Sequence, residues 1–165
     1  MRLREDSVIR PDSRPGVYGV VEMPPAVAIV AIDAAGGVTL VGQFRYPTRR
    51  YSWEIVTGSM ATGETPLAAA RRELKEETGI LAAQWTNIGD CEVSNGVTDQ
   101  IGHIFLAEDL ELGGASPDST EILTTRQVPL AEALTLAHSG QIAQALSIVA
   151  LFRASCQFHD SDHPG

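Results

Sequence analysis

Three glutamates near the middle of the chain are spaced so that together they can bind a cation. Glu73, Glu76 and Glu77 stand at positions i, i+3 and i+4, a spacing that puts side chains on one face of a helix. Like charges at this spacing cost a helix about 0.2 to 0.5 kcal/mol per pair. A bound cation is one reason to keep them together. The alternative is a solvated face with the neighbouring basic side chains as counter-charges.

A helix over residues 66–78 would position these glutamates. Leu67 and Leu74 fall at helical spacing on the opposite face. Thr65 can cap the N-terminus, a proline follows at the first helical position, and Gly79 suits the end of the helix. The segment is therefore predicted to be a helix whose polar face carries the three carboxylates.

The loop in front of this helix extends the pattern. Nine residues fit G-x5-E-x7-R-E-U-x-E-E-x-G-U, where U is a bulky aliphatic residue: Gly58, Glu64, Arg72, Glu73, Leu74, Glu76, Glu77, Gly79 and Ile80. Average residue usage would produce these choices in a given window on the order of once in a billion times. Residues 58–80 resemble the Nudix box, and the chain is similar to Nudix hydrolases over most of its length.

The resemblance implies a metal-assisted attack on a phosphoanhydride. Mg²⁺, or Mn²⁺ in its place, prefers oxygen ligands and keeps several waters, and it lowers the pKa of a bound water. In the family, Glu73 and Glu77 correspond to the primary metal ligands, and Glu76 shares or bridges a metal as part of the catalytic set. The carbonyl of Thr57 or Gly58 can add an oxygen.

Two further box residues look like scaffolding. By the same resemblance, Arg72 and Glu64 form an ion pair between the loop and the helix. We expect this pair to hold the ligand face in place, so that removing Arg72 harms geometry more than chemistry.

Segments before the box are similar to the ADP-ribose pyrophosphatase and nucleotide-sugar branch of the family. In that branch an arginine after a strand and a glutamate before the box flank the substrate, which gives Arg45 and Glu54 here, with Gly58, as expected substrate-binding residues. Residues 94–99 sit where the branch usually has a proline, and this chain has none there. This departure keeps the broader class of nucleoside diphosphate sugars. By the branch resemblance the expected substrate is ADP-ribose or a related nucleoside diphosphate sugar, which would be cut into a nucleoside monophosphate and a sugar phosphate.

Nearby side chains could assist this binding. Arg45, with Arg49 and Arg50, could clamp phosphates, and ordinary surface charge is the alternative. Trp53 or Tyr51 could stack on a base or sugar, or could serve packing alone. His103 lies within a predicted strand and is interpreted as a structural histidine.

The base that activates water must come from outside the box, because the box glutamates are expected to bind metal. Glu121, in the loop before a predicted strand, falls on an acidic position of the same branch and is the predicted base or additional metal ligand. Asp118 and, less favoured, Asp99 are the alternatives, beside an acidic loop without a catalytic role.

The remaining pattern predicts an α/β fold that resembles the family's α/β/α sandwich, with a mixed sheet and the box as loop, helix and loop. Besides the box helix, strands are predicted over residues 17–21, 26–32, 38–44, 53–56, 87–93, 101–107 and 122–128, and helices over 130–138 and 141–155. Residues 1–155 are expected to form one domain and 156–165 a flexible tail.

Composition narrows the partners. A net charge of −9 disfavours nucleic acid as the main partner. No apolar run is long enough to serve as a signal peptide or membrane span, and the two cysteines lack metal-ligand spacing. We therefore expect a cytoplasmic protein. The strand at 17–21 is surplus to the core sheet, and together with the branch resemblance it predicts a homodimer.

Two alternative functions remain open on the sequence. Another Nudix substrate, such as a dinucleoside polyphosphate or a modified nucleoside triphosphate, fits the same box. A catalytically silent sensor of nucleotide sugars is the alternative from another class. The four box glutamates, which such sensors commonly lose, are all retained here.

Overall fold

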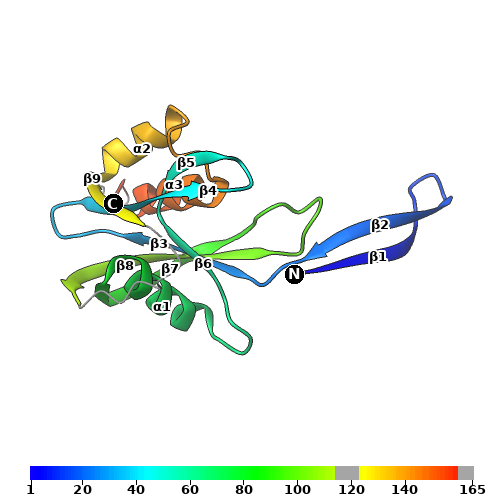
Figure 1. Ribbon diagram of the computed structural model, residues 1–165, viewed down its shortest axis with the longest axis horizontal. Helices are drawn as coiled ribbons and strands as arrows, with labels where there is room; N and C mark the ends of the chain where they lie inside the picture. The colour runs from blue at the N-terminus through cyan, green and yellow to red at the C-terminus, as the bar shows by residue number, and fades with distance from the viewer. Residues whose placement is uncertain (114–122, 160–165) are drawn as a thin grey trace, which may run out of the picture.

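The chain folds around two β-sheets with helices packed against them, as the computed structural model describes for residues 1–113 and 123–159 (Figure 1). The elements in order are β1 (Arg2–Ile9), β2 (Pro15–Glu22), β3 (Ala26–Ala31), β4 (Gly37–Arg45), β5 (Arg50–Glu54), β6 (Val56–Ser59), α1 (Pro66–Thr78), β7 (Ile80–Glu92), β8 (Ile101–Leu112), β9 (Thr124–Pro129), α2 (Leu130–His138) and α3 (Ala145–His159).

The larger sheet is mixed and is covered on both faces. Its strand order is β6-β3-β8-β7, and β3 pairs in parallel with β8 and antiparallel with β6. A second, antiparallel sheet has the order β5-β4-β9. Helix α1 packs on one face of the larger sheet, whereas α2 and α3 lie on the other side (Figure 1). The predicted α/β fold with a mixed sheet is confirmed.

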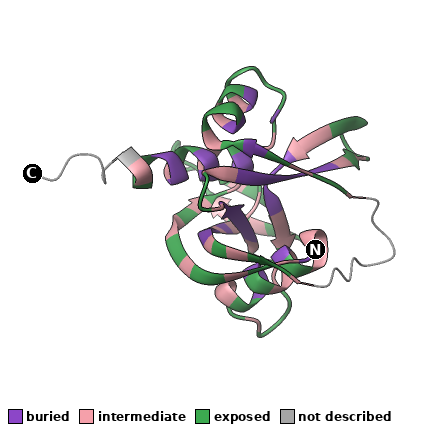
Figure 2. Ribbon diagram, turned by 90° about the vertical axis from the view of Figure 1, so that its left-hand side faces the viewer, coloured by how far each residue is buried: buried purple, intermediate pink, exposed green. Residues whose placement is uncertain are grey.

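Strand β3 explains why two layers of helices are needed. Alternate side chains of a strand point to opposite faces, and both faces of β3 are apolar. Ala28 and Val30 join the core cluster on the α3 side, whereas Val27 and Ile29 join the cluster on the α1 side. All four are fully buried, and Figure 2 shows the buried residues gathered in the centre of the molecule.

The box helix has the predicted ends. The Thr65 side chain accepts a hydrogen bond from the Ala68 N–H at 3.3 Å, and Gly79 ends the helix in the left-handed conformation with φ of 71°. Ala70 and Leu74 are fully buried against the sheet. Local capping and tertiary packing thus agree on the bounds of α1.

The predicted strand at residues 53–56 is wrong as a single element. The chain leaves one sheet after β5 and enters the other at β6, and Ile55 lies between them, fully buried. Its N–H donates to the Ser147 hydroxyl at 3.2 Å. An apolar residue that packs at a crossover looks the same in sequence as one within a strand.

Helix α3 is shifted relative to its prediction. Residues 141–144 precede it, because the N–H groups of Gln141 and Ile142 both donate to the Leu136 carbonyl and so complete the end of α2. At its other end α3 continues to His159, since Phe158 packs against the core. The predicted tail therefore begins within the helix.

Other bounds differ at the ends of strands. β7 begins at Ile80 rather than at residue 87, because it pairs with β8 along a long antiparallel ribbon with one irregularity between Asn87 and Gly89. β9 begins at Thr124, and the first predicted residue of that strand, Ile122, lies outside the described residues.

Strands β1 and β2 form a separate two-stranded hairpin that projects from the rest of the molecule (Figure 1). β1 was not predicted, because charged residues interrupt its apolar ones. The loop 94–99 holds the base of the hairpin: the Tyr18 hydroxyl donates to the Gly96 carbonyl at 2.9 Å, and the Val21 N–H donates to the Val97 carbonyl at 2.8 Å. No helix of the described residues is long and apolar enough to cross a membrane.

Candidate active site

The guanidinium of Arg72 is the hub of the box. It binds Glu64 through two hydrogen bonds, from Nε to Oε1 and from Nη2 to Oε2, each 3.0 Å long. Nη2 also donates to the Ser59 carbonyl at 3.0 Å. This confirms the predicted loop-to-helix ion pair and adds a direct bond to the end of β6.

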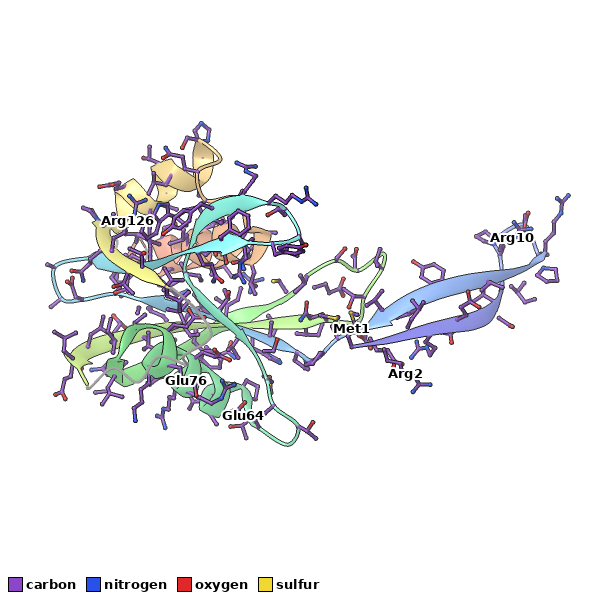
Figure 3. The ribbon with its side chains drawn as sticks, in the orientation of Figure 1. Met1, Arg2, Arg10, Glu64, Glu76 and Arg126 are labelled. Atoms are coloured by element: carbon purple, nitrogen blue, oxygen red, sulfur yellow. The ribbon has the colours of Figure 1, made fainter. Side chains whose placement is uncertain are left out.

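The same guanidinium also reaches Glu73 and Glu76 on α1. Nη1 donates to Glu73 Oε1 at 2.7 Å and to Glu76 Oε2 at 3.0 Å. Figure 3 shows Glu64 and Glu76 side by side, below the sheet and far from the hairpin that carries Arg2 and Arg10. Arg72 is thus more than scaffolding, because it also offsets part of the charge of two carboxylates that are expected ligands.

Gly58 makes room for the Glu73 carboxylate. A Cβ at position 58 would stand 1.9 Å from the Glu73 Cδ atom and 2.2 Å from its Oε1. No side chain larger than hydrogen fits there unless Glu73 moves. The box glycine is therefore a cradle that brings an acidic side chain of α1 against the backbone of β6.

Burial and Arg72 act in opposite directions on two of these carboxylates. Burial raises the pKa of Glu73 above its ordinary value, and hydrogen bonds from Arg72 only partly oppose this. Hydrogen bonds from Arg72 lower the pKa of Glu64. The same partners, Glu64 first, raise the pKa of Arg72, which stays charged.

The donor chemistry fits a hard divalent cation, although the glutamates are turned toward Arg72. Among the described residues, no group of three or more acidic, histidine or cysteine side chains is placed so that it could hold an ion as it stands. A metal that bound Glu73 or Glu76 would compete with Arg72 for their carboxylate oxygens. The Gly58 cradle keeps Glu73 against β6, and carboxylate oxygens are among the ligands that such ions prefer.

Arg45 and Glu54 form a bidentate ion pair across β4 and β5. Arg45 Nε donates to Glu54 Oε1 at 3.0 Å, and Nη2 donates to Oε2. Glu54 is 1% exposed, so without Arg45 its carboxylate would be buried and lack this bidentate partner. The structure brings both predicted residues together, with Glu54 orienting Arg45.

A cavity of about 290 Å³ opens beside this pair. Its lining comes from the β4–β5 hairpin and from the segment around the start of α3: Arg45, Pro47, Thr48, Arg50, Tyr51, Ser52, Glu54, Gln141, Ala143 and Gln144. Of the three arginines proposed as a clamp, Arg49 is not in this lining. The described lining carries two guanidiniums and one carboxylate, so the charged groups of the cavity are positive in sum although the net charge of the chain is −9.

The two aromatic candidates for stacking on a ligand lie in different environments. Tyr51 lines the cavity and is 53% exposed, so it can stack on a ligand. Trp53 packs against the core, and the Arg126 guanidinium lies 4.3 Å from its ring. Sequence reasoning had not singled out Arg126, which no motif marks.

Sequence reasoning also missed Gln141 and Gln144 as cavity residues. Gln144 lies just before α3 and Ser147 within it, three residues apart. Two polar residues at this spacing read as the solvated side of a helix. In the structure Ser147 is fully buried and Gln144 is half-buried, so their polar groups face protein and cavity.

The remaining candidates lie elsewhere. Glu121 and Asp118 fall outside the described residues. Asp99 accepts the Met23 N–H at 3.2 Å, which supports the base of the hairpin. His103 is half-buried and pairs through Nδ1 with Asp90 Oδ1 at 2.9 Å, in agreement with a structural role.

Comparisons with known proteins identify the family that this chain resembles. The NUDIX domain family matches residues 22–147. The chain is 35% identical over 148 residues to an ADP-ribose pyrophosphatase of Bacillus subtilis (strain 168), with 88% of this chain and 80% of that protein covered. It is also 35% identical over 149 residues to an ADP-ribose pyrophosphatase of Mycobacterium tuberculosis (strain ATCC 25618 / H37Rv), covering 88% of this chain and 72% of that one. A crystal structure of an ADP compounds hydrolase superposes with a TM-score of 0.84 at 25% identity, covering 96% and 86% of the two chains.

Replacing Gly58 tests the cradle. In Gly58→Ala, the new methyl group displaces the Glu73 carboxylate, and we expect Mn²⁺ to bind roughly 10- to 100-fold more weakly, as when a residue that orients a metal ligand is lost. Isothermal titration calorimetry measures this directly. Gly96→Ala is the control, because a Cβ there meets nothing within 4 Å. Equal affinity in Gly58→Ala and the control would contradict the cradle.

Glu73→Gln and Glu64→Gln should change stability in opposite directions in metal-free buffer at pH 7. Because the pKa of Glu73 is raised in the folded state, its contribution to folding stability is full below pH 4.5, the ordinary pKa of a glutamate. That contribution is lost as the pH rises through the folded-state pKa. Removing that charge should raise Tm. Because the pKa of Glu64 is lowered in the folded state, its contribution to folding stability is present above pH 4.5. That contribution is lost as the pH falls through the folded-state pKa.

Glu64→Gln should therefore lower Tm. Both variants remove one carboxylate from Arg72, so each serves as the control for the other. Thermal melts in EDTA at pH 7 and at pH 4 measure the difference, which should shrink at the lower pH. Shifts of the same sign at pH 7 would show that burial of Glu73 does not set the balance.

Proposed function

The chain belongs to the Nudix family, and from this premise we propose that it hydrolyses the diphosphate of ADP-ribose or a related nucleoside diphosphate sugar. The products are a nucleoside monophosphate and a sugar phosphate. The main support for the proposal is that β6 lies between the box and the cavity. Gly58 of β6 contacts Glu73 of the box, and the adjacent Thr57 contacts the cavity residue Gln144. The pyrophosphatase relatives support the choice of substrate.

A divalent metal, Mg²⁺ with Mn²⁺ as a substitute, would be held by the box. Glu73 and Glu77 are the proposed primary ligands, Glu76 shares the ion, and the carbonyl of Thr57 or Gly58 completes the protein's share of oxygens. When bound, such an ion polarises phosphorus and lowers the pKa of a water. It also offsets the net charge of −9, which otherwise repels a diphosphate.

The chain's own groups bind and orient the diphosphate. Arg45 and Arg50 supply guanidiniums at the cavity, which match phosphate oxygens geometrically. Glu54 fixes the orientation of Arg45 through their bidentate pair. Tyr51 offers an aromatic face for the base or sugar. Binding thus fixes the scissile bond between the cavity and the box.

Glu121 is the proposed base. Its carboxylate takes a proton from the water that attacks phosphorus, while the bond from phosphorus to the bridging oxygen breaks. The box glutamates are committed to metal, so a carboxylate from another segment is needed.

We also infer that the protein works in the cytoplasm, in keeping with its thiols Cys91 and Cys156, which are both free.

The hairpin β1–β2 supports a homodimer. An isolated two-stranded hairpin is marginal in water. Leu3, Ile9 and Val17 are 74%, 73% and 68% exposed, and the strand register puts them on one face of the hairpin. A second copy of the chain that covers this face would stabilise it.

Metal-dependent turnover tests the proposed function. Pure protein with Mg²⁺ should release AMP and ribose 5-phosphate from ADP-ribose, and excess EDTA should abolish this. Glu77→Gln should lose most of the activity with little change in Tm, whereas Glu132→Gln, at an exposed carboxylate of α2, should not. The same assay should include sugar nucleotides, dinucleoside polyphosphates and nucleoside triphosphates. Turnover in excess chelator, or ADP-ribose bound and left uncut, would contradict the proposal.

The base has its own test. Glu121→Gln should lower kcat by about 10² to 10⁴, the usual contribution of a general base, and leave KM for ADP-ribose nearly unchanged. Steady-state kinetics with Asp118→Asn provide the comparison. Loss of rate in Asp118→Asn alone would transfer the role to Asp118, and normal rates in both would end the assignment to this loop.

The dimer is tested by mass in solution. Light scattering at micromolar concentration should give twice the 17.6 kDa chain mass. Val17→Lys places a charge on the apolar face and should yield monomers. Leu112→Lys, at a leucine that is 90% exposed outside the hairpin, should remain dimeric. A monomeric wild-type protein would contradict the proposal.

A further inference from the structure

Gln144 joins the cavity to strand β6. Its side chain lines the cavity, and its Nε2 group donates to the Thr57 hydroxyl at 3.3 Å. Its Oε1 atom accepts a hydrogen bond from the Ser147 hydroxyl at 2.5 Å. The amide therefore has one end fixed by α3 and the other directed at the strand that leads into the box.

The hydrogen-bond distances agree with this orientation of the amide. The Ser147 hydroxyl accepts the Ile55 N–H at 3.2 Å, and its single proton is then available for the Gln144 Oε1 atom. The 2.5 Å between the Ser147 Oγ and Gln144 Oε1 atoms suits an O–H···O bond and is short for an N–H···O bond, so the oxygen end of the amide faces Ser147 and the NH₂ end faces Thr57. Ser147 is fully buried, so this anchor is shielded from water.

This orientation leaves two donors for a ligand. An amide nitrogen carries two N–H groups, and within residues 1–113 and 123–159 only the one toward Thr57 has an acceptor. The Thr57 hydroxyl, which accepts from Gln144, keeps its own proton for another acceptor. Both groups therefore suit a ligand rich in acceptor oxygens.

The charge of the lining favours the same kind of ligand. Arg45 and Arg50 bring two positive charges to the cavity, and Glu54 brings one negative charge that is paired with Arg45. Phosphate oxygens are pure acceptors and anionic. A nucleobase amino group, as a donor, would find no partner at the NH₂ end of Gln144.

Strand β6 connects the Gln144 amide to the box. Thr57 pairs with Ala28, whose side chain lies on the α3 side of the sheet, and Gly58 pairs with Val27, which lies on the α1 side. Successive residues of a strand face opposite sides. Thr57 thus meets the cavity amide, while its neighbour Gly58 meets the Glu73 carboxylate.

We propose that Gln144 is a positioning and specificity residue whose amide N–H, together with the Thr57 hydroxyl that it orients, donates to acceptor oxygens of the substrate's diphosphate. The proposal rests on the proposed function, and it adds a residue that neither the box nor the arginines supply. Gln144 acts through binding: it orders the diphosphate across the edge of β6, between the cavity and the metal ligands.

The test compares variants that change one property of the amide at a time. Gln144→Leu keeps the size and removes both hydrogen bonds. Gln144→Glu keeps an oxygen for Ser147 and replaces the donor by a carboxylate. Thr57→Val removes the hydroxyl and keeps the backbone carbonyl. Gln84→Leu is the control, because that amide bonds Asp109 on the exposed ribbon of β7 and β8.

Binding of a non-hydrolysable α,β-methylene analogue of ADP-ribose with Mg²⁺ is measured by calorimetry. Gln144→Leu should weaken it about tenfold, as expected for loss of a hydrogen bond to a charged acceptor, and Gln144→Glu should weaken it more because a carboxylate repels phosphate. Adding Thr57→Val to Gln144→Leu should cost little beyond the single change, since the two act as a unit. For ADP-ribose itself KM should rise with kcat nearly constant, while Mn²⁺ affinity should not change.

Unchanged binding in Gln144→Leu, or binding in Gln144→Glu as tight as in the wild type, would overturn the inference. If Gln144→Leu is unstable, Gln144→Glu still decides, because it retains the bond to Ser147. Inorganic pyrophosphate with Mg²⁺ is the second probe. If the wild type leaves ADP-ribose uncut but binds pyrophosphate more tightly than Gln144→Leu does, the proposed function fails and the inference stands. If the wild type binds neither ligand, both fail.

Discussion

The site depends on one guanidinium. Arg72 ties the loop to helix α1 through Glu64, ties both to the end of β6 through the Ser59 carbonyl, and holds Glu73 and Glu76 beside each other. Without a cation among them, these carboxylates would repel one another on one helical face. A guanidinium can satisfy several carboxylates at once because its five N–H groups spread in a plane. The single positive charge of Arg72 offsets only part of the charge of these carboxylates, and a metal would take over and add to this role.

Strand β6 transmits this order to the rest of the molecule. It is an edge strand of the larger sheet, so one of its edges is not paired with a further strand of that sheet. On one side the absence of a side chain at Gly58 admits Glu73, and on the other side Thr57 meets Gln144. The crossover at Ile55, held by Ser147, brings β5 and its buried Glu54 next to β6. The two sheets, the cavity and the box are thereby joined within a few residues.

The sequence predicts those parts of the site that local chemistry determines. The bounds of α1 follow from Thr65, Gly79 and the spacing of Leu74, which act within one segment. The Glu64–Arg72 pair follows from the box pattern. Contacts between distant segments were harder: Arg45 and Glu54 were expected to face the substrate, and their pairing with each other depends on the register of β4 and β5. Gln144 gave no signal at all, because its partner Thr57 lies 87 residues away in the chain.

The central claim is that the box glutamates exchange Arg72 for a divalent metal. Anomalous diffraction from a crystal grown with Mn²⁺ and the α,β-methylene analogue of ADP-ribose tests it most directly. We predict a manganese peak bound by Glu73 and Glu77 beside the backbone of β6, with Arg72 still paired to Glu64 and released from Glu73. A manganese peak elsewhere, with Arg72 retaining Glu73 and Glu76, would contradict the account.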